Sequence, residues 1–133
     1  MIDRSRVEQR LAADQFALGL GIRLLEVGED FLSVGLTIAV PHTNFHGATH
    51  GGVVFSLADC AFSLFSNSYD RDASAIDTHM VFTAGTRPGD DLTATATEIH
   101  RGRTLGTYRV LVRRRDDRLV GNFTGTVFIR PPA

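Results

Sequence analysis

Residues 51–67 read GGVVFSLADCAFSLFSN, and this stretch decides the fold. It contains only two ionisable side chains, the carboxyl group of Asp59 and the thiol of Cys60. Its length and its Ala, Leu, Ser and Phe content predict a helix, and the apolar residues cover the whole circumference instead of one stripe. A helix of this kind is buried on nearly all sides, so we expect residues 51–67 to form the centre of the protein.

Segments rich in β-branched residues and bounded by Gly or Asp turns surround this helix. One helix among six such segments favours an α+β fold in which a curved antiparallel sheet wraps around a long central helix. The first two segments form a hairpin, and the short turns after the helix predict antiparallel neighbours. The predicted strands are Ile22–Val27, Phe31–Val40, Ala75–Phe82, Asp91–His100, Thr104–Arg113 and Leu119–Ile129.

The chain before the central helix contains one more predicted helix and one loop. Val7, Leu11 and Leu18 lie near helical spacing among charged residues, which predicts an amphipathic helix over Arg4–Leu18. Pro41–Thr49 contains Pro, Asn, Gly and His, which is typical of an irregular loop.

Composition limits the class of protein. The 133 residues, of which 43% are hydrophobic and 22% charged, predict a single globular domain over residues 1–133. A net charge of −1 gives no general attraction for nucleic acid or for an anionic membrane. Apolar stretches are too short to cross a bilayer, and residues 1–15 lack the apolar core of a secretion signal. We therefore expect a cytoplasmic protein without nucleic-acid or membrane partners, and the single cysteine fits a reducing compartment.

Asp59 is the first candidate for a functional residue. A carboxylate in an otherwise apolar helix must find a cation, accept hydrogen bonds, or raise its pKa. Each of these outcomes is common at functional sites. The alternative is a structural role, in which Asp59 braces a neighbouring loop.

The second candidate is the start of the helix, His50-Gly51-Gly52. Backbone N–H groups at a helix N-terminus have no partner within the helix, and the helix dipole adds positive potential there. Glycine lets a ligand carbonyl approach these groups closely, so the sequence predicts an oxyanion or anion site. The alternative is an ordinary helix start in which His50 braces the loop.

The spacing of the two candidates predicts an oligomer. Nine residues separate His50 from Asp59, which corresponds to roughly 12 to 13 Å along a helix. One chain cannot bring both ends of that distance to the same carbonyl group. If Asp59 and the Gly51 N–H act on one atom, they must come from two subunits whose helices meet antiparallel across a two-fold axis.

The run from Asn44 to Asp59, NFHGATHGGVVFSLAD, resembles the hotdog-fold acyl-CoA thioesterases of the phenylacetic-acid-degradation type. The resemblance extends from about Phe16 to Ile129. The family pattern continues at Ala61-Phe62, Asn67, Gly89-Asp90 and Gly125-Thr126.

The resemblance implies a hotdog fold, dimers that pair into tetramers, and hydrolysis of an acyl-CoA such as phenylacetyl-CoA. By position, Asp59 would be the catalytic carboxylate, and the Gly51 N–H would polarise the thioester carbonyl. Asn44, His50 and Gly52 would bind the substrate or its attacking water. No cofactor or metal is implied. A thiolate leaves readily, so one carboxylate can suffice, either as a general base or as the nucleophile.

One segment departs from the family pattern. Relatives commonly carry an acid and then an Arg-Pro pair after the first strand that follows the helix, whereas this chain has VFTAG at Val81–Gly85. The acyl preference of this chain therefore does not follow from the resemblance.

Other patterns favour less specific interpretations. The four-residue spacing of His42, His46 and His50 could indicate a metal site only in a helix, which the Pro and Gly residues there disfavour. Cys60 in an apolar helix is typical of packing. Arginines on the late strands could dock coenzyme A phosphates, but Asp116 and Asp117 favour a solvated hairpin for residues 113–115.

Two alternative functions use the same fold. An acyl-thioester hydratase or dehydratase would pair His50 with Asp59 across the dimer and would retain the thioester. An acyl-CoA-binding protein would fill the same groove without hydrolysis.

Overall fold

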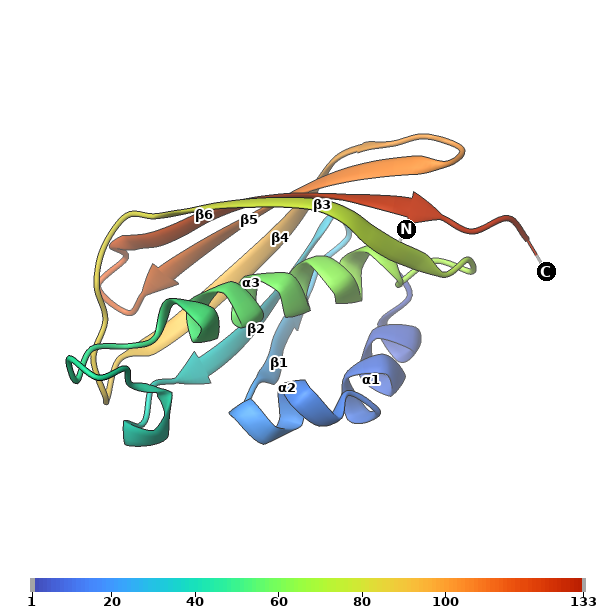
Figure 1. Cartoon of the computed structure of the whole chain (residues 1–133). Helices are drawn as coiled ribbons and strands as arrows, with labels where there is room; N and C mark the ends of the chain where they lie inside the picture. The colour runs from blue at the N-terminus through green and yellow to red at the C-terminus, as the bar shows by residue number, and fades with distance from the viewer. Residues whose placement is uncertain (1, 133) are drawn as a thin grey trace.

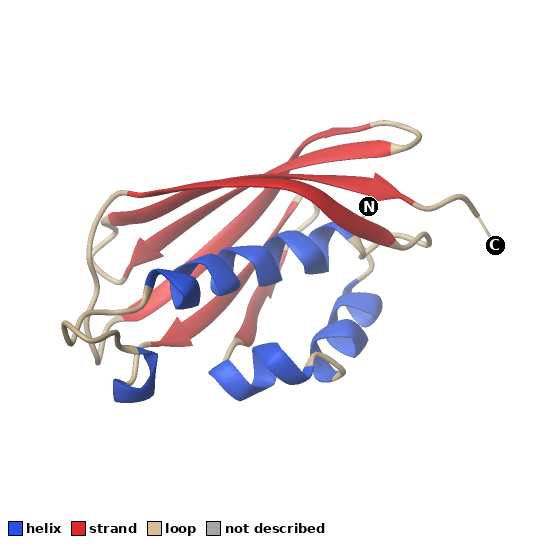
Figure 2. Ribbon diagram, in the orientation of Figure 1, coloured by secondary structure: helices blue, strands red, loops and turns tan. Residues whose placement is uncertain are grey.

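The computed structural model describes residues 2–132 and confirms the α+β fold predicted from the sequence. A single curved sheet covers one side of a long helix, and two short helices lie on its other side (Figures 1 and 2). The helices are α1 (Arg4–Ala12), α2 (Gln15–Leu20) and α3 (Gly51–Ser66), with a 3-10 turn, η1, at Val40–His42. The strands are β1 (Arg23–Val27), β2 (Phe31–Thr37), β3 (Ala73–Phe82), β4 (Asp91–Arg101), β5 (Leu105–Arg114) and β6 (Leu119–Ile129).

All strand pairs are antiparallel, but their order corrects one expectation. The sheet has the order β1-β2-β4-β5-β6-β3, so β3 and β4 follow each other in the chain without being neighbours. Residues 83–90, which include Gly85, Pro88 and Gly89, carry the chain across the end of α3 instead of forming a tight hairpin. Strand β3 consequently pairs with β6 and forms an edge of the sheet.

The core lies between α3 and the concave face of the sheet. Phe62 is 1% exposed, and its ring centroid lies 5.3 Å from that of Phe123 on β6 and 5.8 Å from that of Tyr108 on β5. Burial of a side chain of this size contributes about 1.5 to 3 kcal/mol. The packing of these aromatic rings therefore fixes α3 against the sheet.

Helix α3 is not buried on all sides, as its composition had suggested. Gly52, Ser56, Asp59 and Ser63 follow one another at helical spacing and form a stripe that is exposed or half-buried. This polar stripe of α3 faces away from the apolar core, while α1 and α2 pack on α3 outside the sheet (Figure 1).

The predicted helix over Arg4–Leu18 is also corrected, because two short helices replace it. Ala13 ends α1, and Asp14 begins α2 by accepting a hydrogen bond from the Ala17 N–H at 3.0 Å. Aspartate is a strong N-cap, and the extended backbone conformation of this N-cap residue interrupts the helix. None of the helices in residues 2–132 is long and apolar enough to cross a membrane.

The packing of α3 on β6 predicts the effect of one substitution. A Cβ atom on Gly125 would lie 2.8 Å from Cζ of Phe62, whose ring is held by its aromatic neighbours. We expect Gly125→Ala to destabilise the protein by about 1 to 3 kcal/mol, measured as a lower urea midpoint. Gly85→Ala is the matched control, because a Cβ there has no atom within 4 Å. Equal midpoints for both variants would contradict this account of the core.

Candidate active site

The start of α3 presents one free backbone N–H. His50 is the N-cap, and its Nδ1 accepts a hydrogen bond from the Gly52 N–H at 2.9 Å. The Gly51 N–H donates no hydrogen bond to any acceptor within residues 2–132. Of the two glycines, Gly51 therefore keeps a donor for a ligand. The Gly52 N–H is used by the cap, and a Cβ on Gly52 would lie 3.0 Å from Nδ1 of His50.

Asn44 holds the loop that precedes α3. Its Oδ1 accepts hydrogen bonds from the N–H groups of His46 at 2.9 Å and Ala48 at 3.3 Å. Its own N–H donates to the Ala48 carbonyl at 2.7 Å. The side-chain oxygen of Asn44 is therefore used within the loop, and its NH₂ group remains for other contacts.

A hollow of about 380 Å³ lies beside Gly51. One wall is the start of α3, with Val54, and the other is the end of β3 and the chain after it, from Phe82 to Thr86. The Phe82 ring lies where it would contact a Cβ on Gly51 at 3.5 Å. The segment in which this chain departs from the family pattern therefore forms the wall of this hollow, a relation that no local sequence pattern indicated.

Asp59 faces a different and much smaller cavity, of about 70 Å³. Ser56, Cys60 and Ser63 of α3 line one side of it. The remaining lining comes from Asp14, Phe16, Ala17 and Ile22 at the N-terminal part of the chain. The structure gives Asp59 no ion pair and no hydrogen-bond donor among residues 2–132.

The environment of Asp59 favours its protonated form. Burial raises the pKa of the Asp59 carboxyl above its usual value, and the nearby Asp14 carboxylate raises it further. A carboxylate without a cation and with a raised pKa is a better base than a free one, which suits general-base chemistry near neutral pH.

The Gly51 N–H and the Asp59 carboxylate do not meet within one chain. They lie on one helix, eight residues and therefore about 12 Å apart, and they line different cavities. This agrees with the expectation that one molecule alone cannot present both groups to one carbonyl.

The remaining sequence candidates have structural roles. Burial and the neighbouring carboxylates raise the pKa of the Cys60 thiol to about 12, so Cys60 stays a thiol rather than a nucleophile. His42 Nδ1 accepts a hydrogen bond from the Ala39 N–H at 3.0 Å. Within residues 2–132, no group of three His, Cys, Asp or Glu side chains could hold a metal ion.

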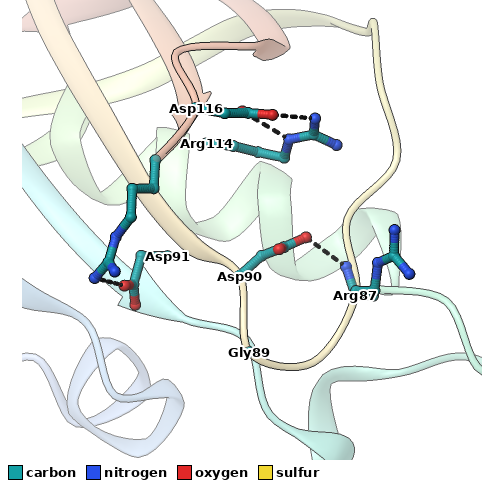
Figure 3. Close-up of a pocket in the computed structure, with 7 residues that line it drawn as sticks. Arg87, Gly89, Asp90, Asp91, Arg114 and Asp116 are labelled. Atoms are coloured by element: carbon teal, nitrogen blue, oxygen red, sulfur yellow. Dashed lines mark hydrogen bonds and ion pairs between the residues drawn. The ribbon is translucent and has the colours of Figure 1, made fainter.

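A charged hollow of about 390 Å³ lies between the β5–β6 turn and the loop before β4 (Figure 3). Arg114 forms a two-point ion pair with Asp116, at 3.0 and 2.6 Å, and Arg115 pairs with Asp91. These pairs leave little positive potential for a phosphate, which agrees with the solvated-hairpin interpretation of residues 113–115.

Known proteins are similar to this chain in sequence and in structure. Residues 46–121 match the family model of the thioesterase superfamily. The acyl-coenzyme A thioesterase PaaI of Escherichia coli strain K12 is 36% identical over 112 residues, which cover 84% of this chain and 80% of that protein. The chain belongs to the thioesterase superfamily.

Solved structures extend the likeness to nearly the whole thioesterase chain. The structure of E. coli PaaI covers 97% of this chain and 94% of its own, with a TM-score of 0.92 and 31% identity. The structure of a mutant of the phenylacetic acid degradation protein PaaI from Thermus thermophilus covers 86% of this chain and 98% of its own, with a TM-score of 0.82 and 36% identity. The expected hotdog fold is confirmed, and the protein is a thioester hydrolase.

The raised pKa of Asp59 has a consequence for stability that can be measured. Because the folded thioesterase binds the Asp59 proton more tightly than the unfolded chain, ionising Asp59 destabilises the fold as pH rises through the raised pKa. We expect Asp59→Asn to raise the Tm by a few degrees at pH 7, because the variant has no carboxyl group to ionise in this partly buried position. The difference should shrink as the pH is lowered, because the wild-type carboxyl then takes up a proton and becomes neutral as well.

Thermal unfolding measured at a series of pH values between about pH 4 and pH 8 tests this expectation. Asp70→Asn, in an exposed loop, is the control and should change the Tm little. A Tm for Asp59→Asn that equals the wild-type value at pH 7 would contradict the account of Asp59.

Proposed function

We propose that this protein hydrolyses acyl-CoA thioesters, with an aromatic acyl group such as phenylacetyl preferred, in a site shared by two copies of the chain. The observation that supports the proposal is that one helix has both a carboxylate without a cation and a backbone N–H without an acceptor. Among residues 2–132, Asp59 has no cation and Gly51 has no acceptor, yet about 12 Å of helix separates them. The relatives named for acyl-CoA and for phenylacetic acid support the choice of substrate.

The edge of the sheet supports a two-copy site. Strand β3 is an edge strand, and Ile76, Val81 and Phe82 on it are 60%, 48% and 53% exposed. An unpaired edge with apolar side chains is a template for pairing with another strand. Two copies joined along β3 across a two-fold axis would run their α3 helices antiparallel, with Asp59 of each facing Gly51 of the other.

The reaction follows from the two groups. The Gly51 N–H donates a hydrogen bond to the thioester carbonyl oxygen and stabilises the negative charge that develops there. Asp59 takes a proton from water while the water oxygen bonds to the carbonyl carbon. The carbon–sulfur bond then breaks, the thiolate leaves with the electron pair, and a proton returns to it. Asn44 and His50 would contact the acyl group or the water through the side-chain NH₂ and Nε2.

Substitutions at Gly51 test the role of its N–H. Gly51 is the first residue of α3, where proline is tolerated, and His50 has an extended conformation that can precede proline. We expect Gly51→Pro to reduce kcat/KM for phenylacetyl-CoA by about 100-fold, the usual effect of losing one oxyanion donor. Gly51→Ala keeps the N–H and adds a Cβ at an ordinary 3.5 Å from Phe82, so it should retain most activity. Equal activities for the two variants would remove the Gly51 N–H from the mechanism.

Mixed dimers test whether the site is shared. Asp59→Asn alone should lower turnover by at least about 100-fold. When Asp59→Asn and Gly51→Pro chains exchange at equal amounts, half of the dimers are mixed and each has one intact site. Thiol release should then recover to about a quarter of the wild-type rate. No recovery after verified exchange would contradict a site shared between two chains.

The hollow beside Gly51 provides a test of acyl preference. Ala84 is a small residue on its wall, so leucine there would fill space that an aromatic acyl group needs. We expect Ala84→Leu to lower kcat/KM for phenylacetyl-CoA about tenfold more than for acetyl-CoA. Ala84→Gly is the control and should spare both substrates. An equal loss for the two substrates would place the acyl group elsewhere.

A further inference from the structure

A second carboxylate shares the cavity in front of Asp59. Asp14 lies in the turn between α1 and α2, far from Asp59 in the sequence, and both side chains line the same 70 Å³ space. Asp14 is half-buried, and its Oδ1 accepts the Ala17 N–H at 3.0 Å. This bond fixes the carboxylate of Asp14 and leaves its second oxygen without a donor among residues 2–132.

The charges around this cavity are not balanced. Neither Asp14 nor Asp59 forms an ion pair with a described residue. The titratable groups that face Asp59 are Asp14, from the N-terminal part of the chain, and Cys60, from α3 itself. The Cys60 thiol is neutral, and the sheet side of α3 is apolar. The two carboxylates therefore act on each other without an offsetting cation from residues 2–132.

The size and polarity of the cavity suit water. A water molecule takes up about 30 Å³ in the liquid and needs two to four polar partners. The cavity offers the two carboxylates and the hydroxyl groups of Ser56 and Ser63. The Ser56 hydroxyl already donates its hydrogen to the Gly52 carbonyl at 2.7 Å, so it can only accept from a water. The carboxylates are the stronger acceptors because they are charged.

We propose that Asp14 is a positioning residue of the thioesterase reaction, and that its carboxylate and that of Asp59 together hold the attacking water by one hydrogen each. This inference rests on the proposed function. A water that donates both hydrogens to carboxylates presents its lone pairs away from them, toward the thioester carbonyl. Asp59 takes one proton as the oxygen bonds to the carbonyl carbon, and Asp14 holds the other hydrogen throughout. This arrangement uses Asp59 as a general base rather than as the nucleophile.

Asp14→Asn separates this role from helix capping. Asparagine is as good an N-cap as aspartate, so the hydrogen bond to Ala17 is kept. The group that faces the cavity becomes an NH₂ donor, which can bind Asp59 but cannot accept a hydrogen from water. We expect kcat for phenylacetyl-CoA to fall about tenfold or more with KM nearly unchanged, because water, not substrate, has lost a partner.

The pH dependence gives a second readout that capping alone would not change. Removal of the like charge lets Asp59 ionise more readily, so the acidic limb of kcat/KM should move to lower pH. The titration of the Asp59 carboxyl, followed by carbon-13 NMR in the free protein, should move in the same direction.

Asp3→Asn is the matched control, since Asp3 caps α1 in the same way, by accepting the Arg6 N–H at 3.2 Å, and does not line the cavity. It should leave both kcat and the pH profile unchanged. Asp14→Ala, which loses cap and carboxylate, should lower kcat at least as far as Asp14→Asn and also lower the Tm.

The outcomes distinguish this inference from the function on which it rests. Wild-type protein that releases no thiol from any acyl-CoA would overturn the proposed function. If the wild-type protein is active but Asp14→Asn leaves kcat and the titration of Asp59 unchanged, the role of Asp14 is overturned and the proposed function stands. If Asp3→Asn lowers kcat as much as Asp14→Asn does, Asp14 acts only as a helix cap and the proposed role is overturned.

Discussion

The burial of one face of α3 against the concave sheet is the constraint on which the rest of the structure depends. Phe62 and its aromatic neighbours hold the helix in place, so its direction and rotation are set by packing. That rotation leaves one stripe of α3 outside the core, and the only carboxylate of the helix lies on it. The packing of α3 on the sheet stabilises the fold enough to tolerate a half-buried carboxyl group that has no cation among residues 2–132.

Much of the fold could be predicted because its signals are local. The helix predicted over residues 51–67 is observed at Gly51–Ser66, and each predicted strand is present within a few residues. Two features were not local. The place of β3 beside β6 depends on how the curved sheet closes, which no turn sequence specifies. The break between α1 and α2 depends on Asp14 as a cap, a signal present in the sequence but outweighed by the apolar spacing around it.

The candidate site was predictable where chemistry stands out against composition. A lone acid in an apolar helix and a glycine pair at its start made Asp59 and Gly51 candidates without any contact information. The hydrogen bonds that occupy His50, Gly52 and the Asn44 side-chain oxygen could not be foreseen, since they depend on the conformation of the loop. Asp14 was missed for another reason, because only tertiary packing brings it to the cavity of Asp59.

The order of strands in the sheet also governs how the chain can acquire its structure during synthesis. Strand β3 follows α3 directly, yet β6, its one strand partner within residues 2–132, is the last of the described strands to be synthesised. Until Leu119–Ile129 has been synthesised, β3 has no strand to pair with among the described residues, and Phe62 of α3 lacks its contact with Phe123. The chain therefore reaches its native topology late and through distant contacts, which favours slow folding and a period of exposure to chaperones.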